Sequence, residues 1–394
     1  MKLRNQLLAL ACLALFGALG VFYFRSWVAP KPFGIIVFIS DALSTRQLTA
    51  ARLYEGGADH RLALDGFPNA ALVRNAARDF AVPDAAAAAS AIATGQRGAH
   101  RQLALDAGGA PLRTLAEIAR REGRSVGIVT NGRLTDPTVA AFYAHLADSR
   151  DKAAVAAQFA LQTTLDVALG GGASDFPPDA LKQRGAIFTT KAELEGAANF
   201  QDRRVVGLFA PGDLPHADQI ESGSQQPSLA DMVRRAIEFL QTNRSGYLLV
   251  VDTALVTRAA EGNEGERTLV ETLAFDHAVA TATRYAGERS LIVAAGKHAI
   301  GGLTLNGFPL RQDHGIALLG INPAGYPTLT WSTGPNGPQP NPTPAARNEP
   351  AAFAQPTALL TAEDMVVLAR GQGADKLHGI IDATEIFDLL RGAL

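Results

Sequence analysis

Several charged or polar residues directly follow short apolar runs, where the strands of a parallel sheet would end. Asp41 follows "GIIVFIS", Asn131 closes "SVGIVTN" and Asp252 closes "GYLLVVD". Lys297 and His298 follow "SLIVAAG". Because functional groups of open α/β sheets collect beyond the carboxyl ends of the strands, we expect these side chains to lie close together. Carboxylates, an ammonium and an imidazole in one place can bind a cation or form ion pairs with each other.

The elements that would position these residues alternate along the chain. The short apolar runs, which also include 166–172 ("DVALGGG") and 364–370 ("DMVVLAR"), are typical of strands buried on both faces. Helical segments lie between them, among them 228–241 ("SLADMVRRAIEFLQ"). We therefore expect one doubly wound α/β domain over residues 32–394, with a mainly parallel central sheet and helices on both faces. Residues 322–356, rich in Pro, Gly and Asn, predict a long surface loop.

Longer segments of the chain carry a family pattern. "VFISDALS", "VPDAAAAASAIATG", "GIVTNGRLTDPTVAAFYAH", "DVALGGG" and "SLIVAAGKHAIGGLTL" follow one another in this order, and "TAEDMVVLARGQGADKLHGIIDATEIFDLL" comes last. In residues and order, this series resembles the alkaline phosphatase family from about residue 33 to residue 390. The resemblance implies that family's fold, a tendency to form homodimers, and a site in which a serine attacks phosphorus beside two zinc ions and one magnesium ion.

The resemblance places the nucleophile at a residue that cannot act as one. In the family, the serine follows the aspartate of "VPD" and starts a helix, whose free N–H groups favour an anion. The matching residue here is Ala85, the first of five consecutive alanines. Ser90 lies five residues further on and matches the threonine that ends the motif. We therefore expect no catalytic nucleophile in this chain.

The zinc ligands implied by the resemblance are mostly replaced. For the first zinc, Thr257 stands where an aspartate is expected, and Glu261 and Leu360 stand where histidines are expected. A single carboxylate from three positions does not make a tetrahedral zinc site. For the second zinc, Asp41 and His298 match, but Lys297 replaces an aspartate. At a few Å an ammonium would repel a dication by several kcal/mol, so we predict no bound zinc.

The magnesium positions keep oxygen donors. Asp41, Asp136, Thr138 and Asp252 match the family's positions, with Asp in place of Glu at 252. Oxygen ligands of this kind suit Mg²⁺, so one magnesium or another divalent cation is one interpretation, with Asp41, Asp136, Thr138, Asp252 and His298 as metal ligands. The competing interpretation is a metal-free ion-pair cluster, either Asp41–Lys297–Asp252 or Asp136–Lys297, because buried carboxylates need a cationic partner of one kind or the other.

Two cations are predicted to bind phosphate. Arg150, in "AHLADSRD", is the nearest match to the family's phosphate-binding arginine, although it stands one residue later than usual. Arginine suits two-point contact with phosphate, but an ion pair with Asp148 or Asp151 is an equal alternative. Lys297 is the second predicted phosphate ligand.

The N-terminus predicts export. Residues 7–24 ("LLALACLALFGALGVFYF") carry no charge and follow the basic segment "MKLR". Such a run is just long enough to cross a bilayer, and basic residues ahead of it favour a cytoplasmic N-terminus. An aromatic cluster at residues 22–27 favours an uncleaved anchor over residues 1–31, while Ala18 and Gly20 leave a cleaved signal peptide as an alternative. A buried core helix is the third reading. We expect the domain on the periplasmic side of the inner membrane.

Composition and motifs together lead to two functional hypotheses. A formal net charge of −2 gives no electrostatic reason to propose a nucleic-acid partner. The first hypothesis is an exported pseudophosphatase, catalytically inactive, that binds phosphate or a phosphoester. The alternative is a phosphomonoesterase with an altered site, in which a single divalent cation activates water.

Overall fold

A computed structural model describes most of the chain. The described residues are 2–27, 31–41, 43–177, 179–181, 185–197, 204–221, 223–307, 315, 319–338 and 349–394.

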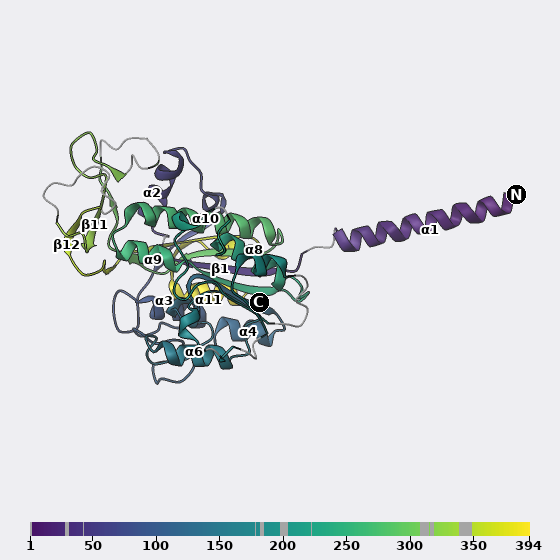
Figure 1. Ribbon diagram of the computed structural model, residues 1–394, viewed down its shortest axis with the longest axis horizontal. Coiled ribbons are helices and arrows are strands. Elements are labelled where there is room, and N and C mark those ends of the chain that lie inside the picture. The colour runs from purple at the N-terminus through teal and green to yellow at the C-terminus, as the bar shows by residue number, and fades with distance from the viewer. Residues whose placement is uncertain are drawn as a thin grey trace.

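The first helix stands apart from the rest of the chain. α1 (Lys2–Trp27) projects away from the body that holds the sheet (Figure 1). Its segment Arg4–Phe22 has a mean hydropathy of 1.9, and none of it is buried. By length and composition it can cross a membrane, which fits a signal or an anchor and is consistent with export. Of the aromatic side chains in residues 22–27, the structure describes that of Phe22, which is exposed.

A ten-stranded sheet forms the centre of the body. Its strand order is β15-β2-β14-β8-β1-β7-β3-β4-β6-β5. All neighbouring strands are parallel except β14, which is antiparallel to both β8 and β2. The strands are β1 (Gly34–Ser40), β2 (Asn69–Arg74), β3 (Ser125–Arg133), β4 (Val167–Gly171), β5 (Ala186–Phe188), β6 (Val205–Leu208), β7 (Tyr247–Asp252), β8 (Leu291–Gly296), β14 (Met365–Arg370) and β15 (Gly379–Asp382).

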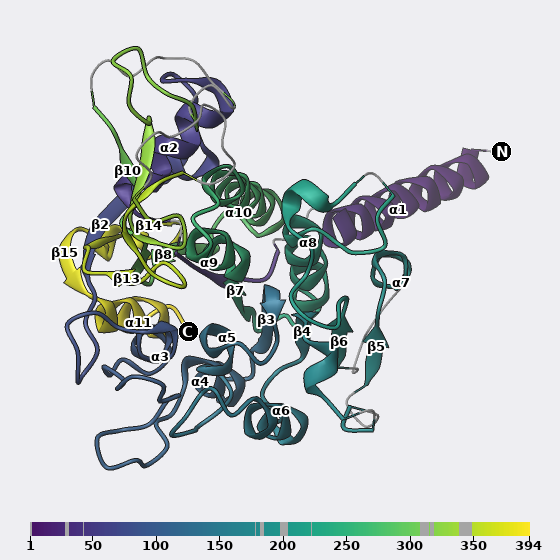
Figure 2. The ribbon, with the colours of Figure 1, turned by 60° about the vertical axis from the view of Figure 1, so that its left-hand side comes forward.

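Helices cover both faces of this sheet, as Figure 2 and Figure 1 show from two sides. β1 alternates between the two apolar cores: Ile35, Val37 and Ile39 belong to one, and Ile36 and Phe38 to the other. The first core is completed by α3, α4, α5, α6 and α11, and the second by α2, α8 and α10. The helices are α2 (Thr45–Gly56), α3 (Ala85–Thr94), α4 (Leu115–Arg121), α5 (Pro137–Ala140), α6 (Lys152–Leu161), α7 (Lys191–Gly196), α8 (Leu229–Leu240), α9 (Ala254–Glu261), α10 (Gly265–Tyr285) and α11 (Ala383–Arg391). The predicted doubly wound, mainly parallel α/β fold is confirmed.

The prediction of a long surface loop over residues 322–356 is wrong in part. This region contains β11 (Leu329–Gly334) and β12 (Ala351–Ala354), which form a second sheet with β10 (Thr304–Leu305). The sheet is anchored by a third apolar cluster, in which Trp331 and Leu329 pack with residues of α2 and α10. The Pro, Gly and Asn residues around the two strands predict a loop. The strands were missed because they are short and pair with segments distant in the sequence. Residues 339–348 of the predicted loop lie outside the described residues.

Candidate functional site: a buried ion-pair cluster

Three adjacent strands bring the predicted site residues to one edge of the sheet. β1 lies between β7 and β8, with Ile39 in register with Asp252 and Ser40 with Gly296. Asp41 and Lys297 each follow the last residue of their strand, so they meet Asp252 beyond the carboxyl ends. The parallel register therefore assembles the cluster that the sequence pattern predicts.

Lys297 lies between two carboxylates. Its Nζ is 3.5 Å from Asp41 Oδ2 and 3.5 Å from Asp252 Oδ1, and it donates a hydrogen bond of 2.9 Å to Thr138 Oγ1. Only 3% of the Lys297 side chain and 1% of each Asp side chain are exposed. Burial lowers the pKa of Lys297, but the attraction of Asp41 and Asp252 outweighs it and the pKa is raised. The lysine is therefore a charged, enclosed ammonium that makes one hydrogen bond and two ion pairs.

His298 and Thr257 complete the surroundings of Asp41. His298 Nδ1 lies 3.3 Å from Asp41 Oδ1, and the Thr257 hydroxyl donates a hydrogen bond to Asp41 Oδ2. Burial lowers the pKa of His298, so the imidazole is neutral at neutral pH. Neither ring nitrogen of His298 has a hydrogen-bond partner among the described residues. Asp252 Oδ2 accepts a hydrogen bond of 2.9 Å from the hydroxyl of Thr130 on β3.

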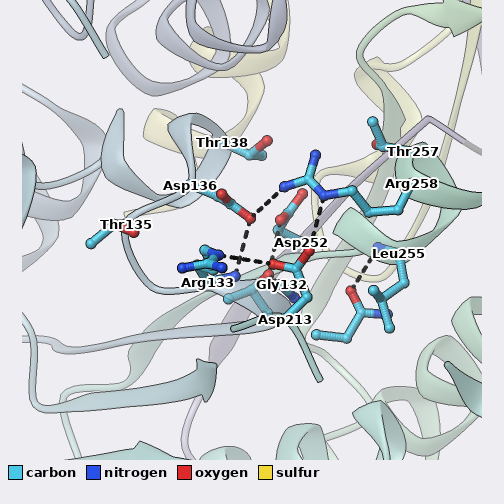
Figure 3. Close-up of polar contacts among 12 residues, drawn as sticks. Gly132, Arg133, Thr135, Asp136, Thr138, Asp213, Asp252, Leu255, Thr257 and Arg258 are labelled. Atoms are coloured by element: carbon cyan, nitrogen blue, oxygen red, sulfur yellow. Dashed lines mark hydrogen bonds and ion pairs between the residues drawn. The ribbon is translucent and has the colours of Figure 1, made fainter. Parts of the chain in front are cut away.

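A second cation, Arg258 of α9, holds the remaining predicted carboxylate. Arg258 Nη2 lies 3.2 Å from Asp136 Oδ2, and its Nε donates to Asp213 Oδ2 at 3.0 Å (Figure 3). Asp213 in turn lies 3.5 Å from Arg133 Nε, so charges of opposite sign alternate across the site. Burial raises the pKa of Asp136, against the lowering effect of Arg258. The Glu261 carboxylate is 3.9 Å from Arg258 Nη1 at the more exposed side.

The four residues that match the family's magnesium positions converge, but cationic side chains already contact their oxygens. Lys297 contacts Asp41, Thr138 and Asp252, and Arg258 contacts Asp136. A divalent cation at this place would lie within a few Å of a buried ammonium, which costs several kcal/mol. Within the described part of the chain, no three His, Cys, Asp or Glu side chains are grouped so that they could hold a metal ion. The residues present therefore do not fit a metal ion beside Lys297.

The zinc positions implied by the family resemblance fit no better. Thr257 is engaged with Asp41, and Leu360 belongs to β13 (Leu360–Thr361), where it pairs with Ile300 of β9 (Ala299–Ile300). Glu261 is the single remaining donor of the first zinc position, and its nearest cation is Arg258.

Ala85 is the first residue of α3, where the family resemblance implies the serine. Asp84 caps the helix by accepting hydrogen bonds from the backbone N–H of Ala87 at 2.9 Å and of Arg101 at 2.8 Å. Ser90 is buried, donates to Gln102 O at 3.1 Å and accepts from the Ala104 N–H at 3.0 Å. Both hydrogen bonds of its hydroxyl therefore go to the loop that follows α3.

Arg150 does not join the cluster. Its side chain is 63% exposed and forms a two-point ion pair with Asp148, with contacts of 3.0 Å from Nε and 2.6 Å from Nη2. This is the surface pair that the sequence allows as an alternative to phosphate binding. Phosphate binding by Arg150 and Lys297 stays a prediction.

Three charged residues of the site, Arg133, Asp213 and Arg258, were not identified from the sequence. Arg258 directly follows Thr257 in the block "VVDTALVTRAAEG", and Asp213 lies in the segment between β6 and α8. The sequence could have indicated Arg258. It directly follows Thr257, which stands where the family has a metal ligand, and a cation there can neutralise the carboxylates that remain without a metal ion. No pattern in the sequence indicates that Asp213 lies beside it.

A sequence model described as alkaline phosphatase matches residues 34–325, about three quarters of the chain. The chain belongs to the alkaline phosphatase family. It is 29% identical to streptomycin-6-phosphate phosphatase of Streptomyces griseus, over 94% of this chain and 92% of that protein. It is 30% identical to alkaline phosphatase 4 of Bacillus subtilis, where the match covers 61% of this chain and 54% of the relative. The resemblance inferred from the motifs is confirmed.

Solved structures of the family share the fold. The alkaline phosphatase of Thermus thermophilus superimposes with a TM-score of 0.75 at 22% identity, covering 93% of this chain and 92% of that one. The enzyme of the Antarctic bacterium TAB5 gives 0.72 at 21% identity, covering 92% and 98%. A point variant of the TAB5 enzyme holds Mg in the site called M3. At these identities, the likeness establishes the architecture alone.

Proposed function

We propose that this alkaline phosphatase family member has lost phosphomonoester hydrolysis and persists as an exported pseudoenzyme. The observation that carries the proposal is the position of Lys297, whose ammonium fills the space between Asp41 and Asp252. A fixed ammonium neutralises carboxylates, but it supplies neither an open coordination position nor an activated hydroxide. The chemistry that the family draws from metal ions therefore has no counterpart at this centre.

Two further observations support the proposal. Ala85 at the start of α3 offers a methyl group, which cannot attack phosphorus. The side chains of Asp41, Asp252, Lys297 and His298 are all exposed by 3% or less, so a substrate phosphoryl group would not reach them without rearrangement. Catalytic stabilisation requires donors within hydrogen-bond distance of the reacting oxygens.

The charge of the centre also disfavours an anion. Three carboxylates, on Asp41, Asp136 and Asp252, face two cations, Lys297 and Arg258. Lys297 Nζ donates to Thr138 and forms ion pairs with Asp41 and Asp252, and Arg150 is paired with Asp148 on the surface. Binding of phosphate or a phosphoester, the second part of the proposal, needs a rearrangement of these contacts. It requires Lys297 or Arg150 to exchange a carboxylate for the ligand.

The alternative is a phosphomonoesterase that uses one divalent cation and water. The convergence of Asp41, Asp136, Thr138 and Asp252 is its support, but it needs Lys297 to leave them. The membrane anchor and the periplasmic location belong to the proposal too, supported by the exposed apolar α1. Homodimer formation is proposed by analogy with the family alone.

The test is hydrolysis of p-nitrophenyl phosphate by the full chain in detergent, with zinc and magnesium supplied. The matched control is Asp41→Asn, which keeps the size of the side chain and removes the carboxylate. We expect both proteins to match the background rate. Metal-dependent turnover that Asp41→Asn abolishes would overturn the proposal in favour of the single-cation enzyme. Phosphate binding is tested separately, by titrating inorganic phosphate into the wild-type chain and into Arg150→Ala.

A further inference from the structure

A cavity of about 180 Å³ lies between α8, α10 and residues 214–220, and Asn131 of β3 lines it. Its walls are largely apolar and include Leu214, Ile220, Leu229 and Leu255. A dry apolar cavity of comparable size can accept a molecule as large as benzene. The cavity is thus large enough for a small organic ligand.

One buried carboxylate lines this cavity. The Glu271 side chain is 1% exposed, and its Oε1 accepts hydrogen bonds from His216 Nδ1 at 2.9 Å and from the Ala217 N–H at 2.8 Å. Its Oε2 accepts a single long hydrogen bond of 3.4 Å from Asn131 Nδ2. A carboxylate oxygen has room for two donors, so Oε2 keeps capacity for another.

Glu271 lacks a permanent counter-charge. Among the described residues, His216 is its sole ion-pair partner. An imidazole carries a positive charge only when it is protonated, so it is not a permanent cation. Buried carboxylates are normally compensated by a paired cation as well as by hydrogen bonds. A ligand that brings a positive charge would supply what this site lacks.

We infer that this cavity binds a small amine, with its ammonium on Glu271 and its apolar part against Leu214, Ile220, Leu229 and Leu255. A charge-assisted hydrogen bond to Oε2 gives selectivity for amines over neutral and anionic molecules of equal size. The site is separate from the Lys297 cluster and does not depend on whether the chain hydrolyses phosphoesters. Asn131 holds part of the cavity wall in place, because its Oδ1 accepts a hydrogen bond of 3.2 Å from the N–H of Leu255 at the start of α9.

The test uses benzylamine, benzyl alcohol and benzoate as probes of nearly equal size and different charge. Each is titrated into the full chain in a nonionic detergent at about pH 8, where alkyl amines are protonated. We expect saturable binding of benzylamine that is about tenfold or more tighter than that of benzyl alcohol, with benzoate weaker still. Equal binding of benzylamine and benzoate would overturn the inference.

Two variants assign the binding to this cavity. Glu271→Gln keeps the shape and the acceptor oxygen but removes the charge, so the preference for benzylamine over benzyl alcohol should disappear. Ala274→Leu fills the cavity from α10 and leaves Glu271 in place, so it should abolish binding of both probes while the circular dichroism spectrum is kept. If Glu271→Gln does not fold, Ala274→Leu still tests whether benzylamine binds in this cavity. Benzylamine binding that survives in a folded Ala274→Leu protein would place the amine elsewhere and contradict the inference.

Discussion

The ammonium of Lys297 lies 3.5 Å from Asp41 Oδ2, and less than a twentieth of either side chain is exposed. The same ammonium is 3.5 Å from Asp252 Oδ1. Two carboxylates from neighbouring parallel strands are thus held together by a cation that belongs to the chain. This relationship leads to the first two predictions.

Removing the Lys297 ammonium should destabilise the fold strongly. Lys297→Met keeps most of the volume and leaves Asp41 and Asp252 without their shared partner. Breaking a buried ion pair from one side typically costs about 3–5 kcal/mol, so we expect a loss of that order in the free energy of unfolding from urea titration. The matched control is Lys152→Met, because Lys152 is an exposed lysine on α6. A change below about 1 kcal/mol in Lys297→Met would contradict a neutralising role for this lysine.

The wild-type chain should not depend on divalent cations for stability, whereas Lys297→Met should gain such a dependence. With Lys297 in place, chelation by EDTA is expected to leave the thermal midpoint unchanged. In the variant, Asp41 and Asp252 are free to bind Mg²⁺ or Zn²⁺, and a ligand at 100 times its Kd stabilises by about 2.7 kcal/mol.

The control for this metal dependence is Lys297→Met combined with Asp252→Asn, which should lose the response to cations. Thermal unfolding is monitored for all three proteins with and without added metal. A midpoint of the wild-type chain that falls in EDTA would show that it binds a structural metal after all.

Restoring the serine alone should not restore activity. In Ala85→Ser the hydroxyl would stand at the start of α3, but Lys297 is held by Asp41 and Asp252, and burial lowers the pKa of His298, which makes this imidazole a weak base. We expect p-nitrophenyl phosphate turnover of Ala85→Ser to equal that of the wild type. Ala86→Ser, one residue along the same helix, is the matched control. Measurable turnover in Ala85→Ser alone would mean that the centre retains a usable base.

Stability should fall with rising pH through a carboxylate far from the cluster. Glu349 is 3% exposed and accepts a hydrogen bond of 2.7 Å from the N–H of Gly265, at the start of α10. Burial raises the pKa of Glu349 from 4.5 to about 7. The folded state therefore favours the protonated form, and this stabilisation is complete below the unfolded pKa and is lost as the pH rises through about 7.

Glu349→Gln measures this effect, because an amide keeps the acceptor oxygen and cannot ionise. Relative to Glu349→Gln, the wild-type free energy of unfolding should fall by about 3 kcal/mol between about pH 5 and pH 8. Urea titrations at a series of pH values give this difference directly. Parallel pH profiles for the two proteins would show that Glu349 does not titrate in this range.

The sequence by itself determined the class of the fold and which residues stand where the family's nucleophile and metal ligands are expected. Apolar runs that end in Asp, Asn or Gly specify buried parallel strands because both faces must be covered. Ala85 and Lys297 are single residues whose chemistry does not depend on conformation, since a methyl group cannot become a nucleophile and an ammonium repels a dication. Pairing of Lys297 with Asp41 or Asp252 followed from their places at adjacent strand ends.

Tertiary structure decided the rest, because it depends on contacts between residues distant in sequence. Arg258 meets Asp136 and Asp213 across separations of 122 and 45 residues, and no local pattern encodes such a meeting. The pairing of β11 with β12 likewise gains its stability from Trp331 packing on α2 and α10 rather than from strand propensity. The cavity beside Glu271 exists because α8, α10 and the segment before α8 leave space between them, and packing volumes are a property of the assembled fold.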